Sequence, residues 1–85
     1  MTQDLILTLS CRDRPGITAR VTGYLFACGG NILEAQQFND QEDGQFFMRV
    51  EFACPAASAA GVRSGFAAIA GEYAMRWNLR VKDAP

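Results

Sequence analysis

The sequence contains no histidine among its 85 residues. That absence excludes imidazole as a general acid or base, as the partner of a serine or cysteine nucleophile, and as a zinc ligand. The acidic residues offer no replacement, because no pair of them falls in the apolar surroundings that acid–base catalysis requires. The chain on its own is therefore not expected to be an enzyme.

Cysteine is scarce, and the three present are Cys11, Cys28 and Cys54. Their number is odd and their spacings match no metal-binding pattern. Free, buried thiols in a reducing compartment are the simplest interpretation, which predicts a cytoplasmic protein. We expect neither a metal ion nor a cofactor.

Long apolar runs and an excess of one charge are also missing. Apolar residues make up 49% of the chain, but no run approaches the roughly 20 residues of a membrane helix. Residues 1–4 lack the basic and apolar segments of a signal peptide. Eight basic residues are balanced by nine acidic ones, so the basic face that nucleic-acid binding requires is not expected. Neither a membrane nor a nucleic acid is a predicted partner.

The length allows one small domain. A chain of this size buries only about 60% of the surface that it exposes when unfolded, so a single core is marginal. This shortfall favours a homodimer, in which a second copy covers part of the surface.

Period-two alternation of apolar residues predicts four strands, at 4–11, 31–39, 45–54 and 75–81. In the first strand, Leu5, Leu7, Leu9 and Cys11 share one face. Asp43-Gly44 is a hairpin signal between the second strand and the third. Asp13 is expected to cap the first helix and Pro15 to occupy its first position.

Two helices are predicted between the strands. The first covers residues 17–28 and ends at Gly29 and Gly30; the second is opened by Pro55. The apolar stripe of the first helix is Ile17, Val21, Tyr24, Leu25 and Cys28, and that of the second is Val62, Phe66, Ile69 and Tyr73. Gly61, Gly65 and Gly71 are expected to let the second helix lie close to the sheet.

The order strand, helix, strand, strand, helix, strand predicts an α+β fold of the ferredoxin-like βαββαβ type. Right-handed crossovers place both helices on one face of a four-stranded antiparallel sheet. The strand at 31–39 should lie at an edge, where an unpaired strand is open to another chain. Gln36, Gln37 and Phe47 are candidates for a contact surface, although an ordinary mixed surface is the alternative.

Two turns are candidate binding elements. The loop 13–16 opens a helix, whose N-terminus attracts a carboxylate; a plain capped helix start is the alternative. The turn 29–32 presents the amide of Asn31, and a structural turn asparagine is the alternative there. The residue pattern alone leaves both alternatives open.

Residues 7–17 (LTLSCRDRPGI) resemble the opening of an ACT domain, and more narrowly that of the N-terminal ACT domain of formyltetrahydrofolate deformylases. Residues 30–40 (GNILEAQQFND) and 46–52 (FFMRVEF) resemble the second and third strands of that family. The resemblance covers nearly the whole chain, and the third string is its most specific part. Arg12 stands where the family usually carries proline, which predicts a looser entry to the loop.

The resemblance implies an ACT regulatory domain over residues 1–81, with 82–85 beginning a linker to an absent catalytic domain. Enzymes of the family are hydrolases that convert 10-formyltetrahydrofolate to formate and tetrahydrofolate in one-carbon and purine metabolism. Their catalytic residues lie in the other domain, so none carries over to this chain. The regulatory site carries over as effector-binding residues Asp13, Arg14, Gly16, Ile17, Asn31, Ile32 and Leu33.

ACT domains typically bind an amino acid between two subunits, and the resemblance suggests glycine or methionine as effectors. One alternative is a stand-alone ACT protein that senses amino acids for a separate partner. Others are a domain that only dimerises, an RNA-recognition module, and an acylphosphatase-like enzyme using Arg12, Arg14 and Asn39.

Overall fold

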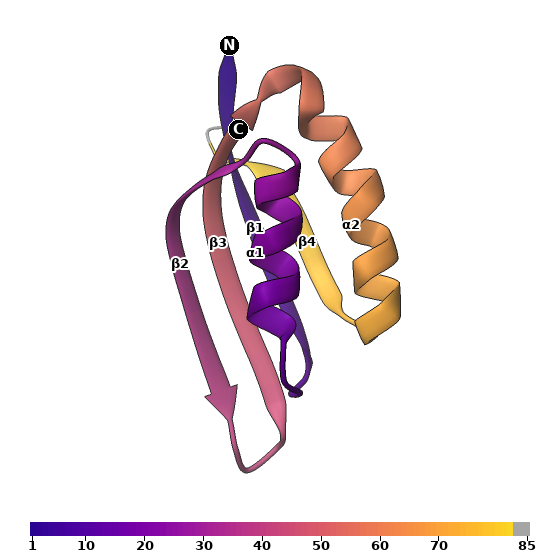
Figure 1. The fold of residues 1–85 in the computed structure, drawn as a ribbon. Coiled ribbons are helices and arrows are strands. Elements are labelled where there is room, and N and C mark those ends of the chain that lie inside the picture. Colours follow the sequence, from indigo (N-terminus) through magenta and orange to yellow (C-terminus); the bar gives the residue numbers. More distant parts are fainter. Residues whose placement is uncertain (83–85) are drawn as a thin grey trace.

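The computed structural model describes residues 1–82 (Figure 1). The elements follow the predicted order, with one added turn of 3₁₀ helix before the second helix. They are β1 (Thr2–Arg12), α1 (Ile17–Ala27), β2 (Asn31–Asp40), β3 (Gln45–Pro55), η1 (Ala56–Ser58), α2 (Ala59–Tyr73) and β4 (Arg76–Val81).

The four strands form one antiparallel sheet in the order β2-β3-β1-β4, and both helices cover the same face of it (Figure 1). This confirms the predicted βαββαβ fold and the edge position of β2. The central pair is the longest, since β1 and β3 are in register from Thr2 opposite Pro55 to Arg12 opposite Gln45.

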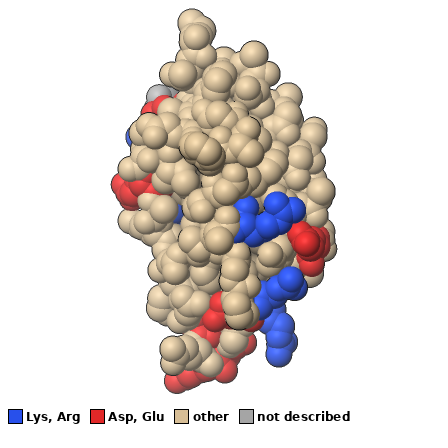
Figure 2. Space-filling view, in the orientation of Figure 1, with Lys and Arg blue, Asp and Glu red and all other residues tan. Residues whose placement is uncertain are grey.

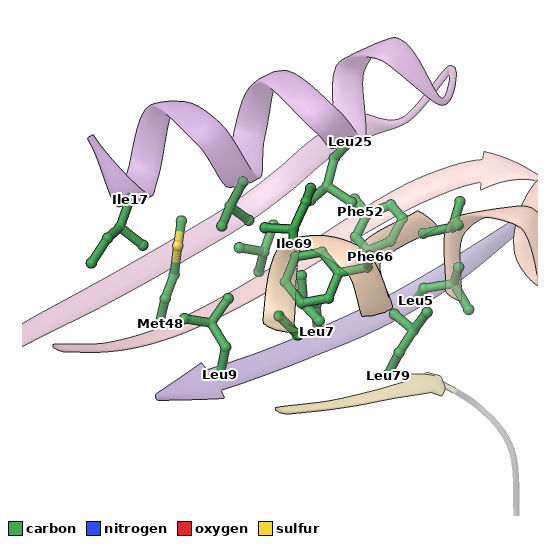
Figure 3. Packing of buried hydrophobic residues seen from close by; sticks show 14 of the residues in the cluster. Leu5, Leu7, Leu9, Ile17, Leu25, Met48, Phe52, Phe66, Ile69 and Leu79 are labelled. Atoms are coloured by element: carbon green, nitrogen blue, oxygen red, sulfur yellow. The ribbon is translucent and has the colours of Figure 1, made fainter. Parts of the chain in front are cut away.

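The core lies between the sheet and the helices (Figure 3). The face of the sheet that the helices cover is built from alternate residues of β1 and β3, as the pattern predicted. From the helices, both predicted stripes point inward. The buried members of the stripes are Ile17, Val21 and Leu25 of α1 and Val62, Phe66 and Ile69 of α2, with Tyr24, Cys28 and Tyr73 partly buried against them.

The helix α1 ends just before Gly29 and Gly30, as the sequence predicted. Gly29 has a positive φ of 82°, a conformation that L-residues with a Cβ rarely adopt. Its N–H donates to the Phe26 carbonyl at 3.0 Å, and the Gly30 N–H donates to the Leu25 carbonyl at 2.9 Å. These two bonds satisfy carbonyls that the helix end would leave open, which is the Schellman arrangement.

The predicted start of the second helix is wrong in detail. Pro55 is the last residue of β3, with ψ at 134°, and α2 begins only at Ala59, after η1. The extended backbone at Pro55 continues the strand. The N–H of Ala56, directly after it, then donates to the Met1 carbonyl at 3.0 Å. The turn η1 is thereby fixed to the start of β1 before α2 begins.

The predicted role of the α2 glycines is also corrected. A Cβ at Gly61 or Gly71 would meet nothing within 4 Å, so neither brings the helix close to the sheet. At Gly65 a Cβ would lie 2.1 Å from the Tyr24 hydroxyl oxygen. That hydroxyl donates to the Val62 carbonyl at 2.8 Å. Gly65 therefore provides the space in which α1 packs against α2.

The strand β4 runs antiparallel to β1, with Val81 opposite Leu5. Lys82 follows it: its N–H donates to the Asp4 carbonyl at 2.9 Å, and its ammonium lies 2.9 Å from a Glu51 carboxylate oxygen. The chain is thus held to the sheet up to Lys82. Of the linker predicted at 82–85, residues 83–85 lie outside the described residues.

The substitution Gly65→Ala tests the packing of the two helices. The new methyl group displaces the Tyr24 ring and its hydrogen bond, so we expect a net loss of about 2 kcal/mol in the free energy of unfolding, although alanine favours helix. Gly71→Ala is the matched control in the same helix. With open space around it, it should raise stability by about 0.5–1 kcal/mol. Urea denaturation followed by circular dichroism measures both, and equal effects would refute the packing role.

The residue after α2, Ala74, has a left-handed backbone with φ 53° and ψ 46°. The Met75 N–H donates to the Ala70 carbonyl at 2.8 Å across this turn, as in the glycine-ended helix α1. A Cβ in this conformation costs roughly 1–2 kcal/mol. Ala74 therefore adopts the left-handed backbone conformation that glycine usually provides at a helix end.

Replacing Ala74 by glycine relieves that cost, while it raises the entropy of the unfolded chain. The net expectation for Ala74→Gly is a stabilisation of about 0.5–1 kcal/mol, seen as a melting temperature higher by roughly 2–8 °C. Ala67→Gly, at an exposed α2 position with helical backbone, should instead destabilise. A lowered melting temperature for Ala74→Gly would contradict the assigned turn.

Candidate functional site

A hollow of about 650 Å³ lies between the N-terminus of α1 and the end of β2. Residues 13–19 form one wall, and Gln37, Asn39 and Phe46 of β2 and β3 form the other. The predicted loop 13–16 is part of this wall, which brings four of the predicted effector-binding residues, Asp13, Arg14, Gly16 and Ile17, to one site.

The α1 N-terminus in this hollow has no side-chain cap. Gly16 has φ 88°, and the first helical bond runs from the Arg20 N–H to the Gly16 carbonyl at 3.0 Å. The N–H groups of residues 17–19 therefore have no partner within the helix. No acidic residue occupies the first turn to neutralise the partial positive charge. The site can accept an anion.

The prediction that Asp13 caps the helix and that Pro15 begins it is wrong. The left-handed turn at Gly16 separates both residues from the helix, which begins at Ile17. Asp13 is instead hydrogen-bonded to the end of the sheet at the β2–β3 hairpin. Its N–H donates to the Gly44 carbonyl at 2.8 Å, and its carboxylate accepts a hydrogen bond from the Asn39 amide at 2.9 Å.

A second hydrogen bond crosses the same hollow. The Thr18 hydroxyl donates to the Gln37 amide oxygen at 2.9 Å. Thr18 was not among the predicted site residues, and Gln37 was assigned to a contact surface. The available clue was the alternation of β2, because Gln37 and Asn39 stand opposite the core residues Met48 and Phe46 and so face α1.

Arg14 is part of the wall of the hollow, but its side chain extends toward the other helix, α2. Its guanidinium carbon lies 4.3 Å from the centre of the Tyr73 ring, a cation–π contact. Arg20 and Glu72 add an ion pair at 3.6 Å between the same two helices. Both contacts, Arg14 with Tyr73 and Arg20 with Glu72, lie on the surface, where each contributes little to the free energy of unfolding. Together they connect the N-terminal part of α1 and its preceding loop to the end of α2.

These positions weigh against the acylphosphatase-like alternative. That chemistry needs an arginine and an asparagine around one anion. Here Arg14 stacks on Tyr73 and the Asn39 amide is bound to Asp13. Arg12 follows Cys11, whose side chain is in the core, so it points to the opposite face of the sheet.

The other predicted site residues, Asn31, Ile32 and Leu33, are not at this hollow. They begin β2, whereas Asn39 lies near its end, about 27 Å further along the strand. One copy of the chain therefore does not bring the two predicted halves of the site together.

The strand β2 is an open edge whose residues, except Asp40, are all exposed. Four large apolar side chains of β2 and of the adjoining helix α1 are exposed: Phe26 (78% exposed), Phe38 (62%), Leu33 (49%) and Ile32 (36%). Figure 2 shows that the upper part of the helix-bearing side is largely uncharged, while basic and acidic side chains lie from its middle to its lower end and at its left margin. Exposed apolar side chains on an unpaired edge strand are typical of a surface that can pair with another chain.

A family model described as the ACT domain matches residues 3–76. The chain is an ACT domain. It resembles the N-terminal ACT region of formyltetrahydrofolate deformylases: it is 41% identical to the Bacillus subtilis deformylase over 81 residues, covering 86% of this chain and 25% of that protein. The crystal structure of the Pseudomonas syringae deformylase superposes with a TM-score of 0.86 at 34% identity, covering 99% of this chain and 28% of that one.

This ACT domain thus spans about a quarter of the length of the deformylases that it matches. An ACT domain protein from Streptococcus pneumoniae has the same fold, with a TM-score of 0.82 at 23% identity, and 97% of that chain is covered. Within residues 1–82, no helix is both long and apolar enough to cross a membrane.

All three cysteines of the domain are free thiols, as predicted, although Cys28 is only partly buried. Burial raises the pKa of the Cys11 thiol in the core; the Asp13 carboxylate adds to this rise, and Arg14 opposes it. Burial also raises the pKa of Cys54, with a further contribution from Cys28. Cys11 and Cys54 are therefore poor nucleophiles near neutral pH.

Thiol reactivity checks this assignment. At pH 8 the folded domain should react with a chromogenic disulfide reagent quickly at one thiol only, because Cys28 alone is accessible. All three should react in denaturant. Cys28→Ser should abolish the fast phase, whereas Cys54→Ser should leave it unchanged. A fast phase that survives Cys28→Ser would show that the core opens more readily than the packing indicates.

Proposed function

We propose that this ACT domain is a regulatory module that binds a free amino acid at the α1 N-terminus and pairs with a second copy along β2. The observation that carries the proposal is the uncapped helix N-terminus at the wall of the 650 Å³ hollow. Its free N–H groups and partial positive charge match the carboxylate that every amino acid carries. ACT domains typically bind small-molecule effectors.

The charge distribution of the hollow suits a zwitterion. The carboxylate of the effector meets the N–H groups of residues 17–19. Its ammonium group meets the carboxylate of Asp13, which is held in place by the Asn39 amide at 2.9 Å. The two ends of an amino acid are thus both recognised by fixed groups, and the side chain of the effector points toward the rest of the hollow.

Pairing along β2 supplies the missing half of the site. If two copies of β2 run antiparallel about a two-fold axis near Ala35, Asn31 of one copy lies opposite Asn39 of the other. The predicted residues Asn31, Ile32 and Leu33 then stand beside the neighbouring copy's loop 13–16. The same pairing satisfies the open edge and covers apolar side chains that are exposed in one copy.

The similarity to deformylases supports a regulatory role in hydrolysis of 10-formyltetrahydrofolate to formate and tetrahydrofolate, with glycine and methionine as the first effectors to examine. The domain would act by favouring one arrangement of the paired copies and of the catalytic domains attached to them. The effect on the enzyme cannot exceed the difference in effector affinity between the two arrangements.

A stand-alone sensor is the second candidate. The S. pneumoniae ACT domain protein, 97% of which is covered, shows that this fold also occurs in a chain of about this length. The reading frame beyond Pro85 distinguishes the two, because a deformylase requires a downstream formyltransferase-like domain.

Mixing two inactive variants tests the shared site. Asp13→Asn removes the ammonium partner and Asn31→Ala removes the contribution of the other copy, so each alone should lose binding of glycine or methionine in calorimetry. In an equal mixture that exchanges subunits, half the dimers are mixed and each has one intact site, so about a quarter of the wild-type binding capacity should return.

Asp43→Asn, in the exposed hairpin tip, is the control and should bind like the wild type. A mixture that recovers no binding would mean that the site is not shared between copies. A wild-type chain that shows no heat with either amino acid at millimolar concentration would count against the effector proposal itself.

A further inference from the structure

The two edge strands of the sheet, β2 and β4, run in opposite directions. β2 is antiparallel to β3 and β3 is antiparallel to β1, so β2 is parallel to β1, whereas β4 is antiparallel to β1. A second copy shifted across the strands, with a slight rotation that follows the twist of the sheet, would therefore set its β2 antiparallel to β4. Repetition of this step would give a continuous antiparallel sheet without an end.

The charges of the two edges permit such a row. β4 has two exposed arginines, Arg76 and Arg80, and no acidic residue, so two copies of β4 would repel each other. β2 contains neither lysine nor arginine, so β4 would not repel it. Of the two edges of another copy, β2 is thus the one that charge allows beside β4.

The backbone groups that β4 presents at its outer edge follow from its pairing with β1. The Lys82 N–H donates to the Asp4 carbonyl at 2.9 Å, in register with the rest of the β1–β4 pair. In an antiparallel pair, alternate residues direct their N–H and C=O groups to the same side. The even-numbered residues of β4 therefore direct theirs to β1, and Trp77, Leu79 and Val81 direct theirs away from the sheet.

Arg63 of α2 covers the middle one of these three positions, because its guanidinium donates a hydrogen bond to the Leu79 carbonyl. α2 lies beside β4 (Figure 1), and the centre of the Phe66 ring, one turn after Arg63, is 5.1 Å from that of the Trp77 ring. Within residues 1–82 Arg63 forms no ion pair, so its charge is not neutralised. A strand approaching β4 would have to displace this charged side chain from the carbonyl that it needs.

The other edge is different. At β2 the neighbouring loop and helix bind side chains and not the backbone: the Thr18 hydroxyl donates to the Gln37 amide oxygen, and the Asp13 carboxylate accepts from the Asn39 amide. These bonds leave the β2 backbone open to a second strand. The sheet thus has one open edge and one edge that a charged side chain covers.

We propose that Arg63 ends the sheet at β4 and so prevents copies of this domain from joining β2 to β4 in a row. This role rests on the proposed function, in which β2 pairs with β2 and the assembly closes at a dimer. In a row, each β2 would lie beside a β4, so Asn31 of one copy would not meet loop 13–16 of another. By covering β4, Arg63 preserves the pairing that completes the effector site.

Sedimentation equilibrium of the 85-residue chain tests this role. Arg63→Ala frees the Leu79 carbonyl, so its weight-average mass should rise steadily with concentration, to at least about twice the wild-type value, because a head-to-tail contact does not close. The wild-type mass should reach a plateau. Arg63→Met retains the aliphatic part of the side chain and its packing. Its mass should rise in the same way, even if alanine destabilises the fold.

Arg80→Ala is the matched control. It removes one positive charge from the same strand, but the backbone groups of Arg80 point to β1 and the Leu79 carbonyl stays covered by Arg63. Its mass should therefore follow that of the wild type. Equal growth of Arg80→Ala and Arg63→Ala would mean that net charge alone guards β4, which would overturn the role of the Arg63 hydrogen bond.

A lysine at Ala35 identifies the strand that adds to β4. Ala35 is exposed in the middle of β2, and a lysine on an edge strand hinders its pairing with another strand. The double variant R63A/A35K should therefore not grow beyond the mass of Ala35→Lys alone. Continued growth of the double variant would contradict the proposal, since a strand other than β2 would then be joining β4.

The wild-type mass separates this proposal from the proposed function. A wild-type chain that stays monomeric at all concentrations would reject the β2 dimer, whereas growth of Arg63→Ala and its reversal by Ala35→Lys would still support the covered edge. If Arg63→Ala and Arg63→Met both keep the wild-type mass at every concentration, Arg63 does not limit assembly and the inference is wrong.

Discussion

The antiparallel pairing of β1 with β3 is the constraint on which the other features depend. It forms the middle of the sheet over eleven residues and places the apolar residues of both strands on one face. Because it leaves β2 and β4 at the two edges, it also decides which strand is open to a partner. The loop that follows β1 and the hairpin that precedes β3 meet at one end of this pair, where Asp13 is bound to Gly44. The candidate site is therefore located by the sheet before any side chain of the site is considered.

Most of the fold could be predicted from the sequence, since the strands and helices have strong and consistent periodicity. Gly29 ended α1 as expected because its positive φ is a local property of the residue. The start of α2 could not be placed in this way. Proline is compatible both with the end of a strand and with the beginning of a helix, and the contact of Ala56 with Met1 decides between them. The function of Gly65 was likewise hidden, because it depends on Tyr24, 41 positions earlier in the chain.

Only part of the candidate site, the loop before α1, could be predicted from the sequence. The short segment 13–17 was identified by its turn residues and by family resemblance, and its members are neighbours in space. The contributions of Thr18, Gln37 and Asn39 follow from the way that α1 lies beside β2, which no local pattern specifies. The prediction that Asp13 caps the helix failed for a related reason. An aspartate near a helix start is a common cap, but the left-handed turn at Gly16 directs it to Asn39 instead.

The attachment of Lys82 to Asp4 and Glu51 has a geometric consequence for signalling. It fixes the point where the polypeptide leaves the sheet at the end that holds Asn31, the full length of the strands away from loop 13–16 of the same copy. In an edge-paired dimer, the exit point of each subunit lies at the end of the assembly that holds its neighbour's ligand. An amino acid bound to one subunit would then be sensed first by whatever is tethered to the other.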